Sequence, residues 1–316
     1  MPWLARRIGI AVLLVWAVAS IVFLAIRFVP GDPAELLLSQ GGVAPDPATV
    51  AELREQLGLD RSILGQYVGD FSRLLRGDLG RSLQDGTPVA REVARRLPRT
   101  LELIGLATVL ATLIGIPGGL FAAIGRHGVL DRVGTWLSGL ALAVPVFVIG
   151  TLMVLLFAQT LRWVPAGGYV SLAVDPVRHL TQVAMPAITI AIGLAATVFR
   201  MTRAAVLDVA QRDYVRTARA KGVGSKRILL HHVLRNALMP VLTVIALHLG
   251  TLLGGTVLVE YVFNYPGLSG LLVDAVNARD YPMVEGVVLV ISVLFVALNL
   301  AMDLLYALLD PRVRTA

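Results

Sequence analysis

The chain has 316 residues, of which 56% are hydrophobic and only 16% are charged, and its mean hydropathy is +0.76. These values exclude an ordinary soluble domain and indicate a polytopic membrane protein. The formal charge of +7 does not indicate nucleic-acid binding, because the basic residues stand beside apolar segments, as the positive-inside rule requires. The absence of cysteine excludes disulfides and thiolate metal sites.

The first predicted element is an apolar run at residues 8–28, which is long enough to cross a bilayer. Arg6 and Arg7 precede this run and place the N-terminus in the cytoplasm. A cleaved signal peptide is the alternative, but the run is too long and no small-x-small site follows it before Pro30. We therefore expect residues 1–29 to form an N-terminal transmembrane helix.

The next segment, residues 30–99, is polar and predicts a small helical region outside the membrane. It contains three amphipathic helical patterns, at residues 46–57, 63–75 and 87–97. Its many arginines do not conflict with this placement, because loops of this length cross the membrane largely regardless of charge.

Five further apolar runs are long enough to cross the membrane: residues 100–124, 133–161, 183–202, 237–259 and 283–309. Together with the first run they predict six transmembrane helices. Basic residues gather after the second and fourth spans and in the tail at residues 311–316, which places these parts and both termini in the cytoplasm. The expected fold class is all-α, with residues 100–310 forming a five-helix core. Pro117 and Pro145 predict mid-span kinks, and two glycine pairs predict close helix packing: Gly115 with Gly119, and Gly250 with Gly254.

Motifs for chemistry on this chain are weak. Neither of the two lysines, Lys221 and Lys226, completes a Gly-Lys-Ser/Thr phosphate loop, and no histidine belongs to an HExxH motif, so no metal site is expected. Ser269 lies in a GxSG pattern typical of rhomboid-type intramembrane proteases. No histidine follows it, and His248 on the preceding span would reverse the order of that family. A glycine-rich turn is therefore preferred, and the protease is kept as a remote alternative.

Three polar residues lie within apolar runs, where they either line a pathway or serve packing: His248, Asn299 and Asp303. Asn299 and Asp303 are four residues apart and share a helix face.

Residues 204–236 form a basic island between two spans and predict a water-facing helical hairpin. Asp213 is the expected N-cap of its first helix, Gly222 the expected left-handed C-cap, and Ser225 the expected N-cap of its second helix. The second helix has an apolar face at helical spacing: Ile228, Leu229, Val233 and Leu234. The alternative is a charged loop that only fixes topology.

Within this hairpin, the stretch RTARAKG at residues 216–222 resembles the cytoplasmic loop of permease subunits in the dipeptide, oligopeptide and nickel family of ABC importers. Arg216 stands where the broader permease pattern has Glu, although the peptide-transporting branch typically shows this form. The resemblance covers the whole chain through further motifs: PGDP at 30–33, LGLD at 57–60, GDLGRS at 77–82, YPGL at 265–268, RDYP at 279–282 and DPR at 310–312.

The resemblance implies the first permease of a pair, which does not itself hydrolyse ATP, in a bacterial inner membrane. The implied partners are a second related permease, one or two cytoplasmic ATPase subunits that carry ATP and Mg²⁺, an external binding protein and membrane lipid. It implies ATPase coupling at the hairpin, through Asp213, Arg216, Thr217, Ala218, Arg219, Lys221, Gly222, Ser225 and Lys226. It implies an external turn on the binding-protein side, with Glu260, Phe263, Pro266, Gly267, Asp280, Tyr281 and Pro282.

Peptides are the cargo that the resemblance favours, with glutathione and a nickel chelate as alternatives from the same family. A stand-alone secondary carrier is a further alternative, although no inverted repeat is evident in the sequence.

Overall fold

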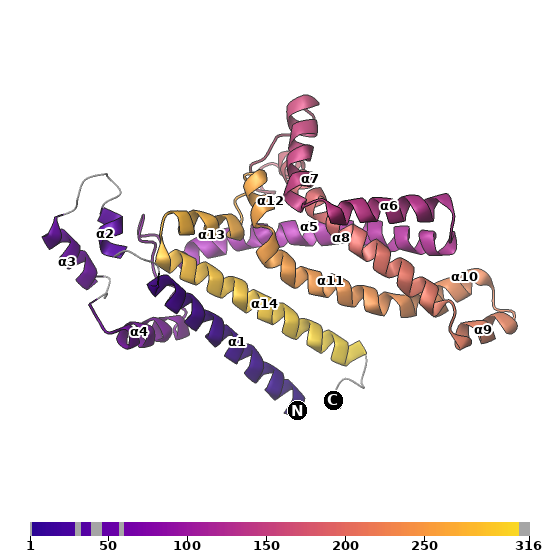
Figure 1. Cartoon of the computed structure of the whole chain (residues 1–316), viewed down its shortest axis with the longest axis horizontal. Helices are drawn as coiled ribbons and strands as arrows, with labels where there is room; N and C mark the ends of the chain where they lie inside the picture. The colour runs from indigo at the N-terminus through magenta and orange to yellow at the C-terminus, as the bar shows by residue number, and fades with distance from the viewer. Residues whose placement is uncertain (1, 29–32, 39–45, 57–59, 310–316) are drawn as a thin grey trace. The chain divides into compact units, whose positions relative to one another are not determined.

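The computed structural model describes residues 2–28, 33–38, 46–56 and 60–309, with only the backbone described at 2–4, 33, 36–37, 53, 56, 302–303 and 305–309. In these residues the regular structure is helical (Figure 1), apart from one isolated β-bridge between Arg81 and Pro88. The predicted all-α fold class is therefore confirmed.

Five helical stretches of the described chain are long and apolar enough to cross a membrane. They are α1 (Pro2–Arg27), α5 (Val89–Ile124), α8 (Pro176–Val209), α14 (Tyr281–Leu309), and the continuous run of α10 (Ser225–Arg227), η3 (Ile228–Leu234) and α11 (Arg235–Gly255). A sixth span results if α6 (Val129–Ala143) is counted together with α7 (Val146–Met153) and the π-helical η2 (Val154–Thr160).

The predicted third span, residues 133–161, is not one continuous helix. Its two parts meet at an angle of 100° at Pro145. Val144 is extended, with φ −93° and ψ 126°, because a residue before proline is driven out of the helical region. Pro117 does not break its helix and lies within the continuous 36-residue α5, so the kink predicted there stays a prediction.

The polar segment contains α2 (Pro33–Leu38), α3 (Pro47–Gln56) and α4 (Ile63–Leu75). The patterns at residues 46–57 and 63–75 are confirmed, and Ser62 caps α4 by accepting a hydrogen bond from the N–H of Gly65 at 3.2 Å. The third pattern does not form a separate helix, because α5 begins at Val89 and continues directly into the predicted span.

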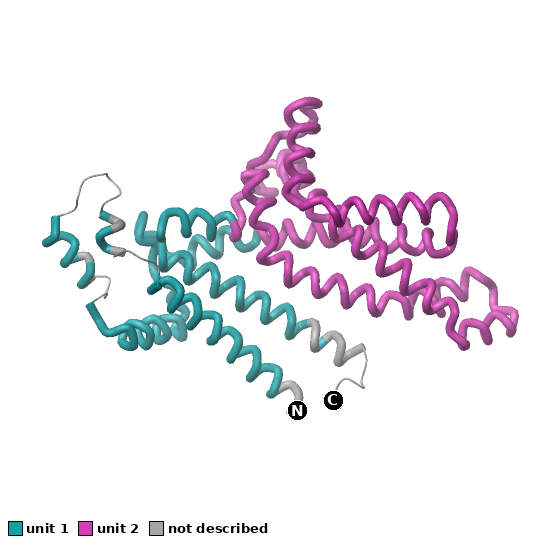
Figure 2. The backbone as a smooth tube through the Cα atoms, viewed as in Figure 1, with its two compact units in different colours: residues 1–98, 270–316 teal, residues 99–269 magenta. Residues whose placement is uncertain are grey.

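The chain divides into two compact units (Figure 2), residues 1–98 with 270–316 and residues 99–269. In the first unit, α1 packs along α14. In the second unit, α8 is the central helix and packs against α6, α7 and α11. The division of the chain at residues 29, 99 and 310 stays a prediction, since these units are defined by packing alone.

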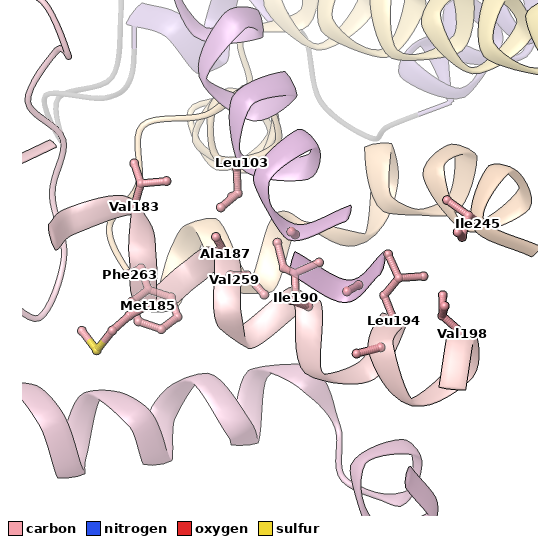
Figure 3. Close-up of a cluster of buried hydrophobic side chains, with 14 of the residues drawn as sticks. Leu103, Val183, Met185, Ala187, Ile190, Leu194, Val198, Ile245, Val259 and Phe263 are labelled. Carbon is pink, nitrogen blue, oxygen red and sulfur yellow. The ribbon is translucent and has the colours of Figure 1, made fainter. Parts of the chain in front are cut away.

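The core of the second unit gathers around α8, and Figure 3 shows side chains of α8 facing Leu103 of α5 and Phe263. Gly115 and Gly119 allow α5 to approach α8, since a Cβ at either position would collide with side chains or carbonyl groups of α8. The predicted close packing of this pair is confirmed. Gly254 differs, because a Cβ there would meet no atom within 4 Å.

Candidate functional site

The basic hairpin lies at the C-terminal end of α8, where α9 (Asp213–Ala220) is joined to α10 by a tight turn. Gly222 has a φ of +76°, and its N–H donates to the carbonyl of Arg219 at 3.0 Å. The N–H of Val223 donates to the carbonyl of Ala218 at 3.2 Å. This pair of bonds is a Schellman motif, which confirms the predicted left-handed cap.

The N-caps predicted for the two hairpin helices are wrong by one residue. Arg212 and Gly224 occupy the N-cap positions, and neither makes a side-chain capping bond. Asp213 and Ser225 are instead the first helical residues. Asp213 still suits its place, because a carboxylate in the first turn interacts favourably with the helix dipole.

The inner side of the hairpin is apolar and buried. It forms one cluster with the ends of α5 and α8 and the start of α11: Ala123, Ala205, Val206, Val209, Val215, Ala218, Ile228, Val233 and Ala237. In addition, the amide of Asn236 donates to the hydroxyl of Tyr214 at 3.2 Å, which links α11 to α9. The hairpin is therefore packed onto the ends of α8 and α11.

The outer side of the hairpin is exposed and basic. Its exposed residues include Arg216, Thr217, Arg219, Lys221, Ser225 and Lys226. Arg216 lies 3.5 Å from Asp213, but both side chains are largely exposed, so this pair adds little stability. No ion pair of the described chain involves Arg219, Lys221 or Lys226. The hairpin thus presents positive charge outward.

A buried carboxylate organises the turn after α11. Glu260, on α12 (Val257–Val262), is 1% exposed and accepts hydrogen bonds from the hydroxyls of Thr100 at 2.8 Å and Thr256 at 3.3 Å. Gly267 lies directly against this carboxylate. Ser269 is fully buried, with its hydroxyl 3.2 Å from that of Thr256. Ser269 lies in the first turn of α13 (Leu268–Asn277) rather than in the predicted glycine-rich turn, and its described hydrogen bonds go to Thr256 and Leu253, so no serine–histidine pair is assembled here.

A second polar network in the same unit is formed by residues that do not share a sequence motif. Nε2 of His179, which is 1% exposed, lies 2.7 Å from a carboxylate oxygen of Glu102. The hydroxyl of Tyr265 donates to the other Glu102 oxygen at 3.4 Å. The guanidinium of Arg99 stacks 4.4 Å from the ring of Tyr169. Burial, and then the neighbouring Glu102, raise the pKa of Tyr265, so its phenol remains a neutral donor.

In the other unit, Asp280 ties two sequence motifs together. Asp280 is 3% exposed and accepts hydrogen bonds from the hydroxyl of Ser82, the N–H of Leu83 at 3.1 Å and the N–H of Met283 at 3.4 Å. The GDLGRS and RDYP stretches therefore form one junction at the start of α14. Tyr281 and Pro282 follow it and are partly exposed.

The other predicted residues are dispersed. Phe263 is buried in the core of its unit, and the carbonyl of Pro266 accepts a hydrogen bond from Arg99 at 3.3 Å. His248 is partly buried on α11. The amide of Asn299 donates to the carbonyl of Phe295 at 2.8 Å, which is a local helix bond. The side chain of Asp303, the DPR stretch, and parts of PGDP and LGLD lie outside the described residues.

Comparison with known proteins covers nearly the whole chain. Residues 115–315 match the family described as binding-protein-dependent transport system inner membrane component, and residues 1–104 match its N-terminal family. A probable peptide ABC transporter permease of Sinorhizobium fredii is 38% identical over 312 residues, which are 99% of each chain. A glutathione transport system permease of Pectobacterium atrosepticum is 40% identical over 94% of each chain. A di/tripeptide transport system permease of Pseudomonas aeruginosa is 37% identical over 99% of each chain.

Proposed function

This chain belongs to the family of binding-protein-dependent transport system inner membrane components, the permease subunits of ABC importers, and we propose that its own cargo is short peptides. Membership makes it a multi-pass protein of the inner membrane that transports rather than catalyses, within a complex of several subunits. The peptide and di/tripeptide permeases among its relatives support this cargo. Glutathione, itself a modified tripeptide, is the alternative that another relative supports. A nickel chelate is the second alternative, on the sequence resemblance alone.

The mechanism rests on one observation, the anchoring of a basic hairpin between α8 and α11. ATPase subunits that carry ATP and Mg²⁺ bind the outer face of the hairpin through acidic groups, which pair with Arg216, Arg219, Lys221 and Lys226. When the ATPase dimer closes, the hairpin moves and carries α8 and α11 with it, and this tilt switches access. In this arrangement the hairpin and both termini face the cytoplasm.

A second, related permease completes the path, and an external binding protein delivers the cargo at the opposite side of the membrane. The buried carboxylates of Glu260 and Asp280 hold their turns in shape and do not themselves touch that protein, since both side chains are at most 3% exposed. The polar residues His248, Asn299 and Asp303 are candidates for the path.

Replacement of Gly222 tests the ATPase contact. Gly222→Val introduces a β-branched side chain at φ +76° and should abolish co-purification of the ATPase while membrane insertion persists. Gly86→Val is the matched control, because Gly86 also has a positive φ of +69° and open space around it, but lies far from the hairpin in the sequence. Equal co-purification of both variants would contradict the coupling role.

Uptake assays test the cargo. A strain that lacks this chain should lose uptake of labelled dipeptides, and excess unlabelled dipeptide should compete in the wild type. If only glutathione or only a nickel chelate competes with uptake, that compound and not a peptide is the cargo. Uptake that persists without the ATPase subunits would instead identify a stand-alone carrier.

A further inference from the structure

Helix α4 lies beside the C-terminal end of α1, within the first unit (Figure 1). The ring of Tyr67 packs edge-on against that of Phe23, with 5.3 Å between centroids, and its hydroxyl lies 2.8 Å from that of Ser20. Nε of Arg27 donates to the side chain of Gln66 at 3.0 Å. These contacts fix where α4 sits along α1.

The contacted part of α1 lies inside the apolar span. Residues 5–27 form the candidate membrane span, and Ser20 lies seven residues before its end, which is about 10 Å along the helix axis. The neighbouring Ile21 and Leu24 are 64% and 45% exposed at the same level, so the surface of α1 there is apolar and uncovered. An uncovered apolar surface on a membrane span has the polarity that contact with lipid requires.

Arg27 is the last residue of this apolar span, and α4 supplies polar partners for its guanidinium. Besides Gln66, the guanidinium of Arg27 lies 3.6 Å from Asp70 of α4 and 3.9 Å from Glu285 of α14. A charged residue at the end of a span is better accommodated when polar partners surround it. The contacts of Arg27 with Gln66 and Asp70 therefore favour docking of α4 against the end of the α1 span.

The side of α4 next to this packing face carries an exposed apolar ridge. Leu64, Val68 and Leu75 are 72%, 59% and 87% exposed. Their spacing of four and seven residues places them within about 40° of one another around the helix. Arg76 follows Leu75 about 100° further around, and it is exposed on a different side.

We propose that α4 is an interfacial membrane helix, a role that does not depend on the cargo or the coupling proposed above. Its ridge of Leu64, Val68 and Leu75 inserts into the acyl chains of the leaflet around the Arg27 end of α1, and Arg73 and Arg76 remain at the phosphate level. This is the arrangement of an amphipathic helix with one apolar side and basic residues on its polar side. The lipid bilayer is favoured as the occupant because the ridge stands beside the exposed apolar surface of α1.

Single-cysteine labelling tests this inference, since the natural chain contains no cysteine. Full-length Leu64→Cys, Val68→Cys, Leu75→Cys and Arg76→Cys variants would carry an environment-sensitive fluorophore in vesicles of phosphatidylethanolamine and phosphatidylglycerol. We expect blue-shifted emission and quenching by doxyl-labelled lipid at the three ridge positions. We expect red-shifted emission and quenching by aqueous iodide at Arg76→Cys, which is the matched control adjacent to Leu75.

Equal exposure of Leu75→Cys and Arg76→Cys to iodide would overturn the inference. Shielding of the ridge that appears only after the binding protein is added would also overturn it, in favour of a protein partner. All four positions are exposed, so the label should not disturb folding, and circular dichroism of each variant checks this.

Discussion

Gly267 lies so close to the buried carboxylate of Glu260 that a Cβ at position 267 would overlap both carboxylate oxygens. Gly267→Ala should therefore lower the free energy of unfolding by about 2 kcal/mol, the usual cost of overpacking a tight site. Thermal melting of the detergent-solubilised protein measures this change. Gly254→Ala is the control, because that position of α11 has open space, so alanine should leave the melting temperature unchanged or raise it slightly through its higher helix propensity.

If the steric explanation is correct, Glu260→Ala should remove the penalty of Gly267→Ala, and the two changes should be strongly non-additive. Additive effects would show that Gly267 is required for another reason.

Asp280 provides a second prediction, because its carboxylate accepts hydrogen bonds from backbone N–H groups and from a hydroxyl at the same time. Asp280→Ala leaves the N–H of Leu83 without its acceptor and should cost about 2 kcal/mol. Asp280→Asn should cost clearly less, since the amide oxygen still accepts from Leu83 and the amide N–H₂ can donate to the hydroxyl of Ser82. Resistance of the 77–89 segment to proteolysis measures the difference. Equal losses in both variants would show that the negative charge, rather than the acceptor, holds this junction.

Local patterns predicted the parts of the structure that local forces determine. The cap at Gly222 and the amphipathic α4 follow from spacing and backbone preference within a few residues. The kink predicted at Pro145 is confirmed as a break of 100°, but Pro117 stands in an equally apolar run and leaves its helix unbroken. Which proline breaks a helix depends on the packing around it, and a single sequence does not contain that information.

The polar clusters show the same limit. Glu260 and Asp280 were predicted from the family resemblance, but their hydrogen-bond partners, Thr100 and Ser82, lie more than 150 residues away in the chain. The pair of Glu102 and His179 lies in no motif, and only the fold brings the two side chains together.

The close approach of α5 to α8 gives a third prediction. Gly119→Val should destabilise the protein by about 2 kcal/mol, because its Cβ would meet the carbonyl of Phe199 and the side chain of Thr202. Gly105→Val on the same helix is the matched control, since a Cβ there meets nothing within 4 Å. Melting temperatures in detergent compare the two. A Gly105→Val variant that loses as much stability would show that the loss does not come from the contact between α5 and α8.

The ion pair between Asp131 of α6 and Arg203 of α8 gives the last prediction. Nη2 of Arg203 donates to Oδ2 of Asp131 at 2.9 Å, and the Asp131 side chain is only 6% exposed. Arg203→Ala leaves the Asp131 carboxylate with only the N–H of His127 among its described donors, and should lower the melting temperature. The double variant Asp131→Ala with Arg203→Ala should be more stable than Arg203→Ala, because it also removes the unpaired charge. Melting curves of the three variants decide this, and a double variant that is less stable than Arg203→Ala would show that Asp131 is held mainly by other contacts.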